Sequence, residues 1–467
     1  MAEPTTLTAC PVRPPGELPP PAATTHRPPG PGLLRMSAIA ARFSTEPYAF
    51  LPEIARRYGD VVDIPVPVPG VTVTLVSHPD HVDHIMTRHH LRYHKHEGTA
   101  ELVTGEPPAL PLLEGEEWKR TRRPLNPFFS ERALAANSTP MVEAIAERVA
   151  DWEVHARSGG WVDLEHEIGP VVMDGLLRSI ADLALSPEQL HEYVDGARSY
   201  GQWVVGRAAM YKFPAFVPRP FGRRGAAAKT IMFGELDRWV AERRAQPPRE
   251  RPDIFQTLLE MEFPGTPDQQ YARMRSELSG LVFAGFETTA EALAWTIALL
   301  ARNPRALGEA YAEVDALGGG RVEYEHLERL PYLRACFDEA QRFQAAPANV
   351  RTATEEDEIG GYFIPAGSHV VISPYGLQRD PRFWRDAEQF EPRRFIEDKI
   401  NRNAFIPFNI GPRKCMGSRM AYIEGLLTLA TILQKFTVQI RDGWTPRHRI
   451  RVSTGLAGGL PAKLALR

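Results

Sequence analysis

The chain contains 467 residues, of which 43% are hydrophobic and 24% are charged. These fractions are those of a globular protein with a substantial core, and they exclude a disordered, collagenous or disulfide-scaffold chain. The 55 basic and 58 acidic residues leave a formal charge of -3. Such a balance argues against a general binder of nucleic acid or of an anionic membrane, so we expect neither partner.

The cysteine content and the N-terminal sequence bear on the compartment. Only three cysteines occur, Cys10, Cys336 and Cys415, and an odd, sparse set does not make a disulfide framework. No basic segment followed by an apolar run stands near the N-terminus, so we predict neither a signal peptide nor a membrane anchor. We therefore expect a cytoplasmic protein.

The first part of the chain is rich in proline. Residues 1–33 contain runs such as Pro19-Pro20-Pro21, which are too dense for helix or sheet, and we expect this segment to be extended or disordered. No internal repeat and no second linker follow it. Residues 34–467 are therefore predicted to form a single domain.

Apolar spacing predicts the remaining elements, and helical spacing dominates from about residue 116 to residue 302. In chain order, we predict a helix at 47–58, strands at 61–64 and 71–76, turns at 214–222 and 246–252, a long helix at 270–302 ended by Pro304, a helix beginning at Pro331, hairpin strands at 360–373 and a final helix at 421–436. The fold class is mainly α with small β-sheets and a long central helix.

One cysteine stands in a glycine-bracketed loop directly before the final helix. The loop reads Phe-Asn-Ile-Gly-Pro-Arg-Lys-Cys-Met-Gly over residues 408–417. A helix N-terminus stabilises a sulfur anion, and glycines let the backbone turn tightly and approach a flat ligand. The competing interpretation is a buried, inert cysteine, which the flanking residues argue against.

The pattern Phe-x-x-Gly-x-Arg-x-Cys-x-Gly in this loop closely resembles the haem-binding signature of the cytochrome P450 family. The resemblance implies the cytochrome P450 fold and a haem b cofactor whose iron takes the Cys415 thiolate as its axial ligand. It also implies that Phe408 packs beside the sulfur, that Gly411 and Gly417 shape the loop, and that Arg413 pairs with a haem propionate.

Two further motifs match the family in the expected order. Glu339-x-x-Arg342 and Phe-x-Pro-x-Arg394-Phe resemble its charge network behind the haem loop, to which we assign a structural role. Trp118-x-x-x-Arg122 resembles a second propionate-binding motif, and Arg351 stands where many members carry another propionate-binding arginine. The alternatives are an exposed helix pair for the first motif and an exposed arginine for Arg351.

The long helix carries Ala284-Gly285-Phe286-Glu287-Thr288-Thr289, which resembles the oxygen-activation motif of the same family. Small residues such as Ala284 leave room for dioxygen, and a threonine hydroxyl and a carboxylate can relay protons. We therefore predict Glu287 and Thr288 as catalytic residues. Without a haem, Thr288 would be an ordinary helix residue and Glu287 a solvated one.

The resemblance implies a monooxygenase that transfers one oxygen atom of O2 to a small molecule. No flavin or nicotinamide fingerprint is present, so electrons are expected from a separate ferredoxin and ferredoxin reductase. An acidic ferredoxin would meet five basic residues on the cysteine side, Lys119, Arg120, Arg123, Lys414 and Arg419. The alternatives are a peroxide-using or non-oxygenating haem-thiolate enzyme, and a haem-binding sensor without turnover.

The substrate is predicted from residues expected over the haem. The aromatic residues between 200 and 221 favour a bulky, largely apolar natural-product intermediate such as a terpenoid, a polyketide or a modified aromatic amino acid. The candidate contacts are Trp203, Met210, Phe213, Phe283 and, as a polar anchor, Asn349. The alternative is that these aromatics pack as helix core. Histidines between residues 81 and 96 are expected to be solvated, because no ligand frame accompanies them.

Overall fold

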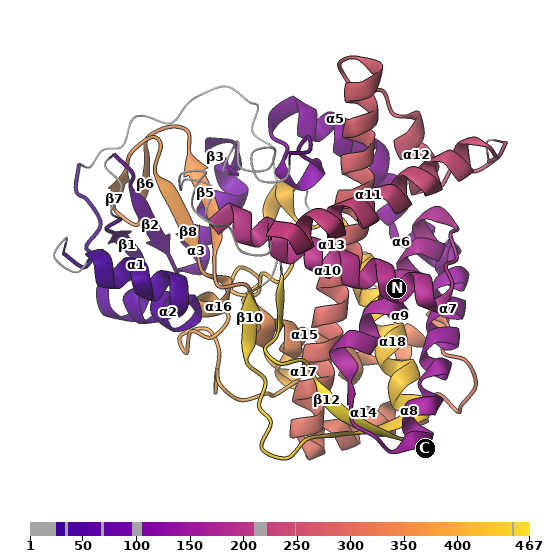
Figure 1. Cartoon of the computed structure of the whole chain (residues 1–467). Coiled ribbons are helices and arrows are strands. Elements are labelled where there is room, and N and C mark those ends of the chain that lie inside the picture. Colours follow the sequence, from indigo (N-terminus) through magenta and orange to yellow (C-terminus); the bar gives the residue numbers. More distant parts are fainter. Residues whose placement is uncertain are drawn as a thin grey trace, which may run out of the picture.

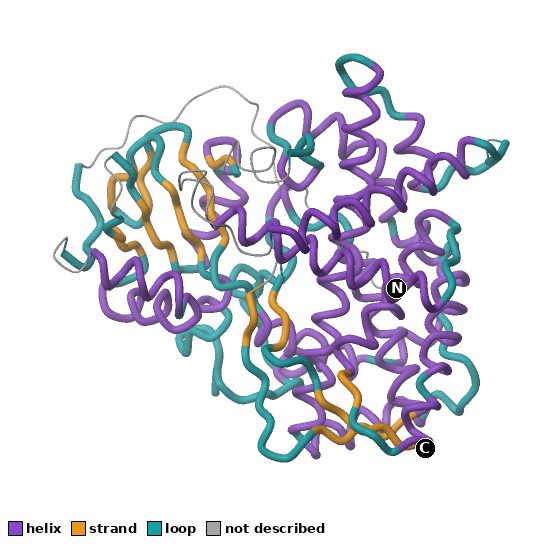
Figure 2. The backbone as a smooth tube through the Cα atoms, in the orientation of Figure 1, coloured by secondary structure: helices purple, strands orange, loops and turns teal. Residues whose placement is uncertain are grey.

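The computed structural model describes residues 25–32, 36–66, 70–95, 105–209, 222–247, 249–450 and 453–467. In these ranges the chain is mainly helical with small sheets, which confirms the predicted fold class (Figure 2). Within them, no helix is both long enough and apolar enough to span a bilayer. Most of the proline-rich segment lies outside the described residues, so its expected disorder stays a prediction.

A mixed sheet lies on one side of the molecule, with two helices beside it (Figure 1). The strands follow the order β1-β2-β8-β5-β3, and β2 pairs with β8 in parallel while the other neighbours are antiparallel. The elements are α1 (Met36–Thr45), α2 (Pro47–Tyr58), β1 (Val61–Ile64), β2 (Val73–Val76), α3 (Pro79–Asp83), β3 (Tyr93–His94), β5 (Asn349–Ala353) and β8 (His369–Ile372). One face of α2 buries Phe50, Leu51 and Ile54 against this sheet, so α2 anchors to it by apolar burial.

The helical part of the molecule fills the other side (Figures 1 and 2). Its first helices are α5 (Gly115–Leu125), α6 (Glu131–Ala136), α7 (Ser138–Asp151), α8 (Glu153–Ser158), α9 (Leu164–Ala181), α10 (Pro187–Ala209), α11 (Gly222–Arg244) and α12 (Ile254–Glu260). α9 is buried along most of its length because it packs between α7 and α13. The turn predicted at 214–222 lies mostly outside the described residues, whereas the one at 246–252 separates α11 from α12.

The long helix α13 (Pro267–Arg302) crosses the core, as predicted. It begins three residues earlier than the apolar pattern indicated because Thr266 and Gln269 form a capping box and Pro267 occupies the first turn. Its C-terminal half is almost wholly buried and forms the centre of the main apolar cluster. The helix ends before Pro304, which opens the next helix instead of continuing this one.

The C-terminal elements surround α13. They are α14 (Pro304–Asp315), α15 (Pro331–Gln344), β6 (Asp357–Ile359), β7 (Tyr362–Ile364), α16 (Pro374–Leu377), α17 (Arg394–Glu397), α18 (Ser418–Lys435), β9 (Phe436–Ile440), β10 (His448–Ile450), β11 (Thr454–Leu456) and β12 (Pro461–Leu466), with β4 (Val162–Asp163) paired to β12. The hairpin prediction for 360–373 is wrong in its pairing. β6 and β7 form the hairpin, because Gly360 and Gly361 both take positive φ between them, and β8 joins the large sheet.

A buried charge network ties α15 to the irregular chain before the cysteine loop. Glu339 accepts hydrogen bonds from Arg342 at 2.7 and 2.9 Å and from Arg394 at 3.2 Å, and all three side chains are at most 2% exposed. Arg342 also donates to the carbonyls of Gln378, Ala387 and Gln389. The network therefore fixes chain that has no regular secondary structure of its own.

We expect Glu339→Ala to lower the free energy of unfolding by about 3–5 kcal/mol, because two buried guanidinium groups would lose their counter-ion. Urea denaturation followed by circular dichroism measures this loss. Arg393→Ala is the matched control, since Arg393 lies beside Arg394 but its side chain is 42% exposed, and it should leave stability unchanged within error. Equal effects of the two substitutions would contradict the structural role of the network.

Candidate active site

A cavity of about 680 Å³ lies between the middle of α13 and the cysteine loop. Apolar side chains dominate its wall, and Arg122, Arg413 and Lys414 line it beside the cysteine loop. Residues that the sequence singled out and that line it are Trp118, Arg122, Ala284, Thr288, Asn349, Phe408, Arg413, Cys415 and Gly417. The sequence motifs therefore meet at one internal space, although they are spread over some three hundred positions.

The cysteine loop is held by its own backbone and by one close approach. The Cys415 amide donates to the Phe408 carbonyl at 2.9 Å, and the Lys414 amide donates to the Gly411 carbonyl at 3.0 Å. Gly411 has φ +71, and a Cβ on it would lie 2.1 Å from the carbonyl oxygen of Met86, so no other residue fits. Gly417 has φ -80 and would meet Phe129 only at 3.9 Å, so the backbone does not require glycine there.

The thiol of Cys415 opens into the cavity in front of α18. Burial raises its pKa, while the Gly417 amide and the cations of Arg122 and Lys414 lower it. The polypeptide alone thus favours the neutral thiol. A bound metal cation would reverse this balance, since coordination deprotonates a thiol.

Positive groups crowd the cavity wall beside this loop. Arg413 donates to the carbonyl of Leu113 at 2.5 Å and to the Glu114 carboxylate, and its guanidinium stacks 4.2 Å from the Trp118 ring. Arg122 lies 5.3 Å from the same ring and donates to the Lys414 carbonyl at 2.9 Å. Trp118 thus separates two guanidinium groups of equal charge.

Lys95 and Arg351 complete this cationic cluster, which we define as Lys95, Arg122, Arg351 and Arg413. Burial lowers the pKa of Lys95 to about 8, and the charges of Arg351 and Arg413 lower it further. Burial, with Arg413, also lowers the pKa of Arg351 to about 10, although Glu114 opposes this. Two of the donors, Nη1 of Arg413 and Nη2 of Arg351, are buried without a partner among the described residues.

The cationic cluster is suited to an anionic ligand, because buried donors without partners and mutually repelling charges are costly until an anion meets them. Sequence reasoning missed Lys95 and Glu114. Lys95 follows a histidine-rich stretch that reads as surface, and Glu114 precedes the Trp-x-x-x-Arg motif by a few positions. The Lys95 amide donates to Glu114 at 2.8 Å, and Lys95 lines the cavity.

On α13, the residues that resemble the oxygen-activation motif, 284–289, point in different directions. Ala284 and Thr288 face the cavity, and the Thr288 hydroxyl donates to the Ala284 carbonyl at 2.8 Å. Gly285 allows close helix packing, because a Cβ there would lie 2.7 Å from Leu176 of α9. Glu287 is 2% exposed, is not part of the cavity wall, and lies 3.5 Å from the Arg198 guanidinium of α10.

The predicted substrate contacts are only partly placed at the cavity. Trp203 is 8% exposed and packs against Tyr200 and Gly225 between α10 and α11, so the alternative of helix core holds for it. Phe283 packs against the main apolar cluster and is absent from the cavity wall.

Asn349 lines the cavity, but it donates to Asn409 at 2.6 Å and accepts from Arg351 at 2.5 Å. Met210 and Phe213 lie outside the described residues.

The expectation that the histidines near residue 90 are solvated is wrong for several of them. His84 lies 2.8 Å from the carboxylate of Asp357, which also accepts from the Tyr93 hydroxyl at 2.6 Å. His81 is half-buried, and burial lowers its pKa. These histidines support packing between α3 and the hairpin β6–β7.

A cysteine thiol, a group of cations with two unpartnered buried donors, and a helix with a small residue and a threonine meet at one internal cavity. This arrangement is suited to a haem held by a cysteine thiolate. The family model described as Cytochrome P450 matches residues 27–457. The chain therefore belongs to the cytochrome P450 family and is a monooxygenase of that family, as the sequence motifs predicted.

Curated relatives agree with this assignment. The chain is 30% identical over 454 residues to "Cyclooctatin synthase" of Streptomyces melanosporofaciens. This match covers 91% of this chain and 92% of that protein. It is 26% identical to "Cyclooctat-9-en-7-ol 5-monooxygenase" of the same organism, over 72% of this chain and 74% of that protein. It is 35% identical to "Cytochrome P450 97B2, chloroplastic" of Glycine max, over 40% of this chain and 38% of that protein.

We expect Gly411→Ala to destabilise the protein by ~1–3 kcal/mol more than Gly443→Ala, because only Gly411 would press a Cβ against backbone. Gly443 is the matched control, since it has φ +72 against +71 for Gly411 but has no atom within 4 Å of an added Cβ. Thermal and urea unfolding of both variants measure the difference. Equal losses would show that the loop yields to the extra methyl group.

Proposed function

We propose that this chain inserts one oxygen atom of O2 into a bulky, largely apolar small molecule, with electrons delivered by a ferredoxin and a ferredoxin reductase. The observation that carries this proposal is one cavity whose wall includes Cys415, Thr288 and three members of the cationic cluster, Lys95, Arg122 and Arg413. A cytoplasmic location is part of the same proposal, because the protein and the ferredoxin system would have to share one compartment.

The cofactor that fits is haem b, whose iron supplies oxygen activation once a cysteine thiolate pushes electron density into it. Cys415 would hold the iron. The free donors of Arg413 and Arg351, with Lys95 and Arg122, would hold the two propionates through charge-assisted hydrogen bonds. Such anions would remove the repulsion that now lowers the pKa of Lys95.

Thr288 is the proposed proton-delivering group at the cavity. Its hydroxyl faces the cavity while it donates to the Ala284 carbonyl, so rotation lets it accept from water and donate to a bound ligand. Glu287 stays a proposed proton donor behind it. Its carboxylate pairs with Arg198, so it would serve the cavity only after turning away from that guanidinium.

The proposed substrate is a natural-product intermediate, of which a terpenoid is one class. The cavity wall supports an apolar molecule, since it includes Leu110, Leu176, Ile180, Leu258 and Leu281. The relative named for cyclooctat-9-en-7-ol supports the same class. Asn349 is not a free anchor, because Arg351 and Asn409 already use its amide group.

The test of the proposed function is the reduced, CO-bound spectrum of Cys415 variants. Cys415→Ser should abolish the thiolate-type spectrum and Cys415→His should convert it to an imidazole type, because the axial atom sets the electronics of the iron. Cys336→Ser is the control, since Cys336 is buried in α15 and does not line the cavity. Unchanged spectra in both Cys415 variants would overturn the assignment.

Turnover then separates the alternatives. Substrate oxidation with ferredoxin, reductase and O2 supports the monooxygenase proposal. Oxidation with hydrogen peroxide alone would identify a peroxide-using enzyme. The absence of any turnover with a bound, spectrally normal cofactor would favour a sensor.

We expect Thr288→Ala to lower product formed per electron several-fold and to raise hydrogen peroxide release, with the cofactor still bound, because the cavity loses a hydroxyl that moves protons. Peroxide and product are measured against electrons consumed. Thr296→Ala is the matched control, since its hydroxyl makes the same type of bond on α13, to the Ala292 carbonyl at 2.6 Å, but outside the cavity. Equal coupling in both variants would assign Thr288 a structural role only.

An exposed basic surface supports the proposed partner. Lys119, Arg120 and Arg123 on α5 and Lys414 and Arg419 near the cysteine are all exposed. They flank the loop that holds Cys415, so a partner bound there would be close to the cofactor. Rim charges of this kind act mainly on the encounter rate of acidic partners.

We expect Arg120→Glu combined with Lys414→Glu to slow reduction by an acidic ferredoxin about tenfold at low salt, because rim charges steer association. The rate should also depend less on salt than in the wild type. Stopped-flow reduction over a salt series measures both effects. Arg56→Glu, an exposed charge on α2, is the control. An unchanged rate would mean that the basic surface serves only solubility.

A further inference from the structure

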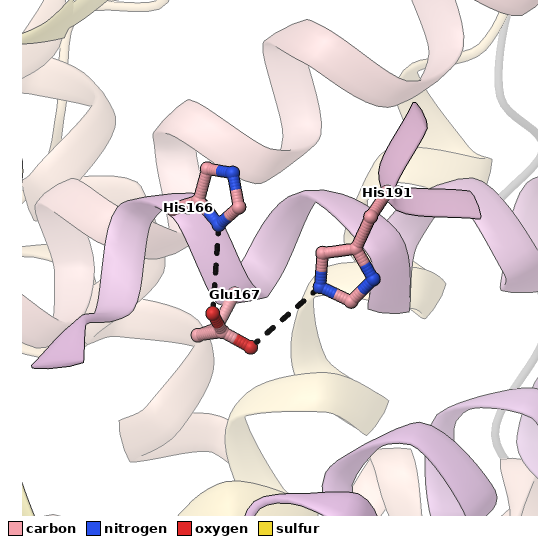
Figure 3. Close-up of side chains that lie close together, drawn as sticks. All are labelled: His166, Glu167 and His191. Carbon is pink, nitrogen blue, oxygen red and sulfur yellow. Dashed lines mark hydrogen bonds and ion pairs between the residues drawn. The ribbon is translucent and has the colours of Figure 1, made fainter. Parts of the chain in front are cut away.

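Two histidines and one glutamate converge on the surface between α9 and α10, away from the cavity (Figure 3). His166 and Glu167 lie in the first turn of α9, and His191 lies near the start of α10. One ligand atom from each lies within 4.8 Å of the others. Among the described residues, this is the one set of histidine, cysteine and acidic side chains that meets this criterion.

The spacing of these atoms is that of ligands around a metal ion. Oε1 of Glu167 lies 3.5 Å from Nδ1 of His166, and Oε2 of Glu167 lies 3.9 Å from Nε2 of His191. Two ligands bound to zinc at ~2.0–2.1 Å in tetrahedral geometry are about 3.4 Å apart. The observed separations are longer than good hydrogen bonds. A metal ion between the rings would require the Glu167 carboxylate to turn so that it faces both of them, and the ligand atoms to close in from within 4.8 Å of one another.

The outer ring nitrogens already have the partners that metal-binding histidines use. Nε2 of His166 lies 3.1 Å from the Asp195 carboxylate, one turn beyond His191 on α10. Nδ1 of His191 lies 2.8 Å from the Pro187 carbonyl. Ligating histidines commonly give their second N–H to a carboxylate or a backbone carbonyl, which fixes the ring and leaves the other nitrogen for the metal.

We propose that His166, Glu167 and His191 form a binding site for a divalent transition-metal ion of the zinc type, with solvent in the fourth position. Two imidazoles and one carboxylate suit Zn²⁺ and its neighbours, whereas Ca²⁺ and Mg²⁺ prefer sites built from oxygen alone. The ligands are accessible from solvent, since the side chains of His166 and His191 are 40% and 41% exposed.

A metal here would join two helices that also meet at the proposed proton-delivery region. Arg198 lies two turns after His191 on α10, donates to the Glu165 carbonyl at 3.0 Å and faces Glu287 at 3.5 Å. The site would therefore hold α10 against the N-terminal turn of α9. The proposal does not depend on the proposed reaction, because its test reads metal binding directly.

The competing explanation is a metal-free ion network. His166 lies between Asp195 and Glu167, which raise the pKa of its ring to about 10, and His155 lies 3.5 Å from the same Glu167. Such a network would need no metal to balance its charges. Binding measurements on the haem-loaded chain separate the two explanations.

The experiment uses full-length, untagged, haem-loaded protein, because a free Cys415 thiolate would itself bind zinc. After treatment with EDTA and dialysis, Zn²⁺ is titrated by calorimetry at pH 7.5, and bound zinc is counted by elemental analysis. The expected stoichiometry is one ion per chain. Zinc X-ray absorption should show imidazole nitrogen and carboxylate oxygen, without sulfur.

The variants give the proposal its sharpest test. Asp195→Asn should weaken zinc binding about 10- to 100-fold, as loss of an outer partner does, and His191→Ala and Glu167→Gln should weaken it more. His90→Ala is the matched control, since this half-exposed histidine also bonds a backbone carbonyl but has no place in the cluster. Each variant must keep the wild-type CO spectrum and melting temperature in EDTA, which shows that it folds.

Two results would overturn the proposal. Fewer than about 0.1 zinc ions per chain at a tenfold excess of metal would leave the ion network as the explanation. Binding that His90→Ala reduces as much as His191→Ala would indicate scattered surface binding instead of this site.

Discussion

The buried carboxylate of Glu339 is the constraint on which the cysteine loop depends. Water does not reach it, so its charge is tolerated only while Arg342, Arg394 and the Glu391 amide face it. The remaining donors of the two arginines form hydrogen bonds to carbonyls of the irregular chain between α16 and α17. Side-chain charge, and not a helix or sheet ladder, therefore sets the path of the backbone that leads to Cys415.

The opposite arrangement holds at the cavity wall, where positive charge exceeds negative charge. Three of the four cations, Lys95, Arg351 and Arg413, interact with the carboxylate of Glu114. Their repulsion and their unused donors favour an anionic group beside them, so binding of an anion there would also stabilise the fold. The Trp118 ring, the Leu113 carbonyl and the Glu114 carboxylate together hold Arg413 in place at this wall.

The sequence predicted best the features that depend on residues close together in the chain. The fold class, the long helix, and the meeting of Cys415, Arg413 and Trp118 at one cavity followed from motifs whose spacing is rigid. The motif did not predict the orientation of each side chain on the helix: Glu287 and Thr288 are neighbours in the chain, yet Glu287 contacts Arg198 and Thr288 faces the cavity. Lys95 was missed because a buried lysine has no sequence signature apart from its tertiary partners. Trp203 was misassigned since aromatic residues on amphipathic helices serve cores and pockets alike.

The packing of Trp203 has a mechanical consequence. An added Cβ at Gly225 would lie 2.0 Å from the Trp203 ring, so the indole fills a groove that the missing side chain leaves on α11. This contact holds the two helices together, and the Arg207 guanidinium lies 4.9 Å from the centre of the same Trp203 ring. Because the indole occupies the space that a side chain at position 225 would take, any residue larger than glycine there would push α10 and α11 apart.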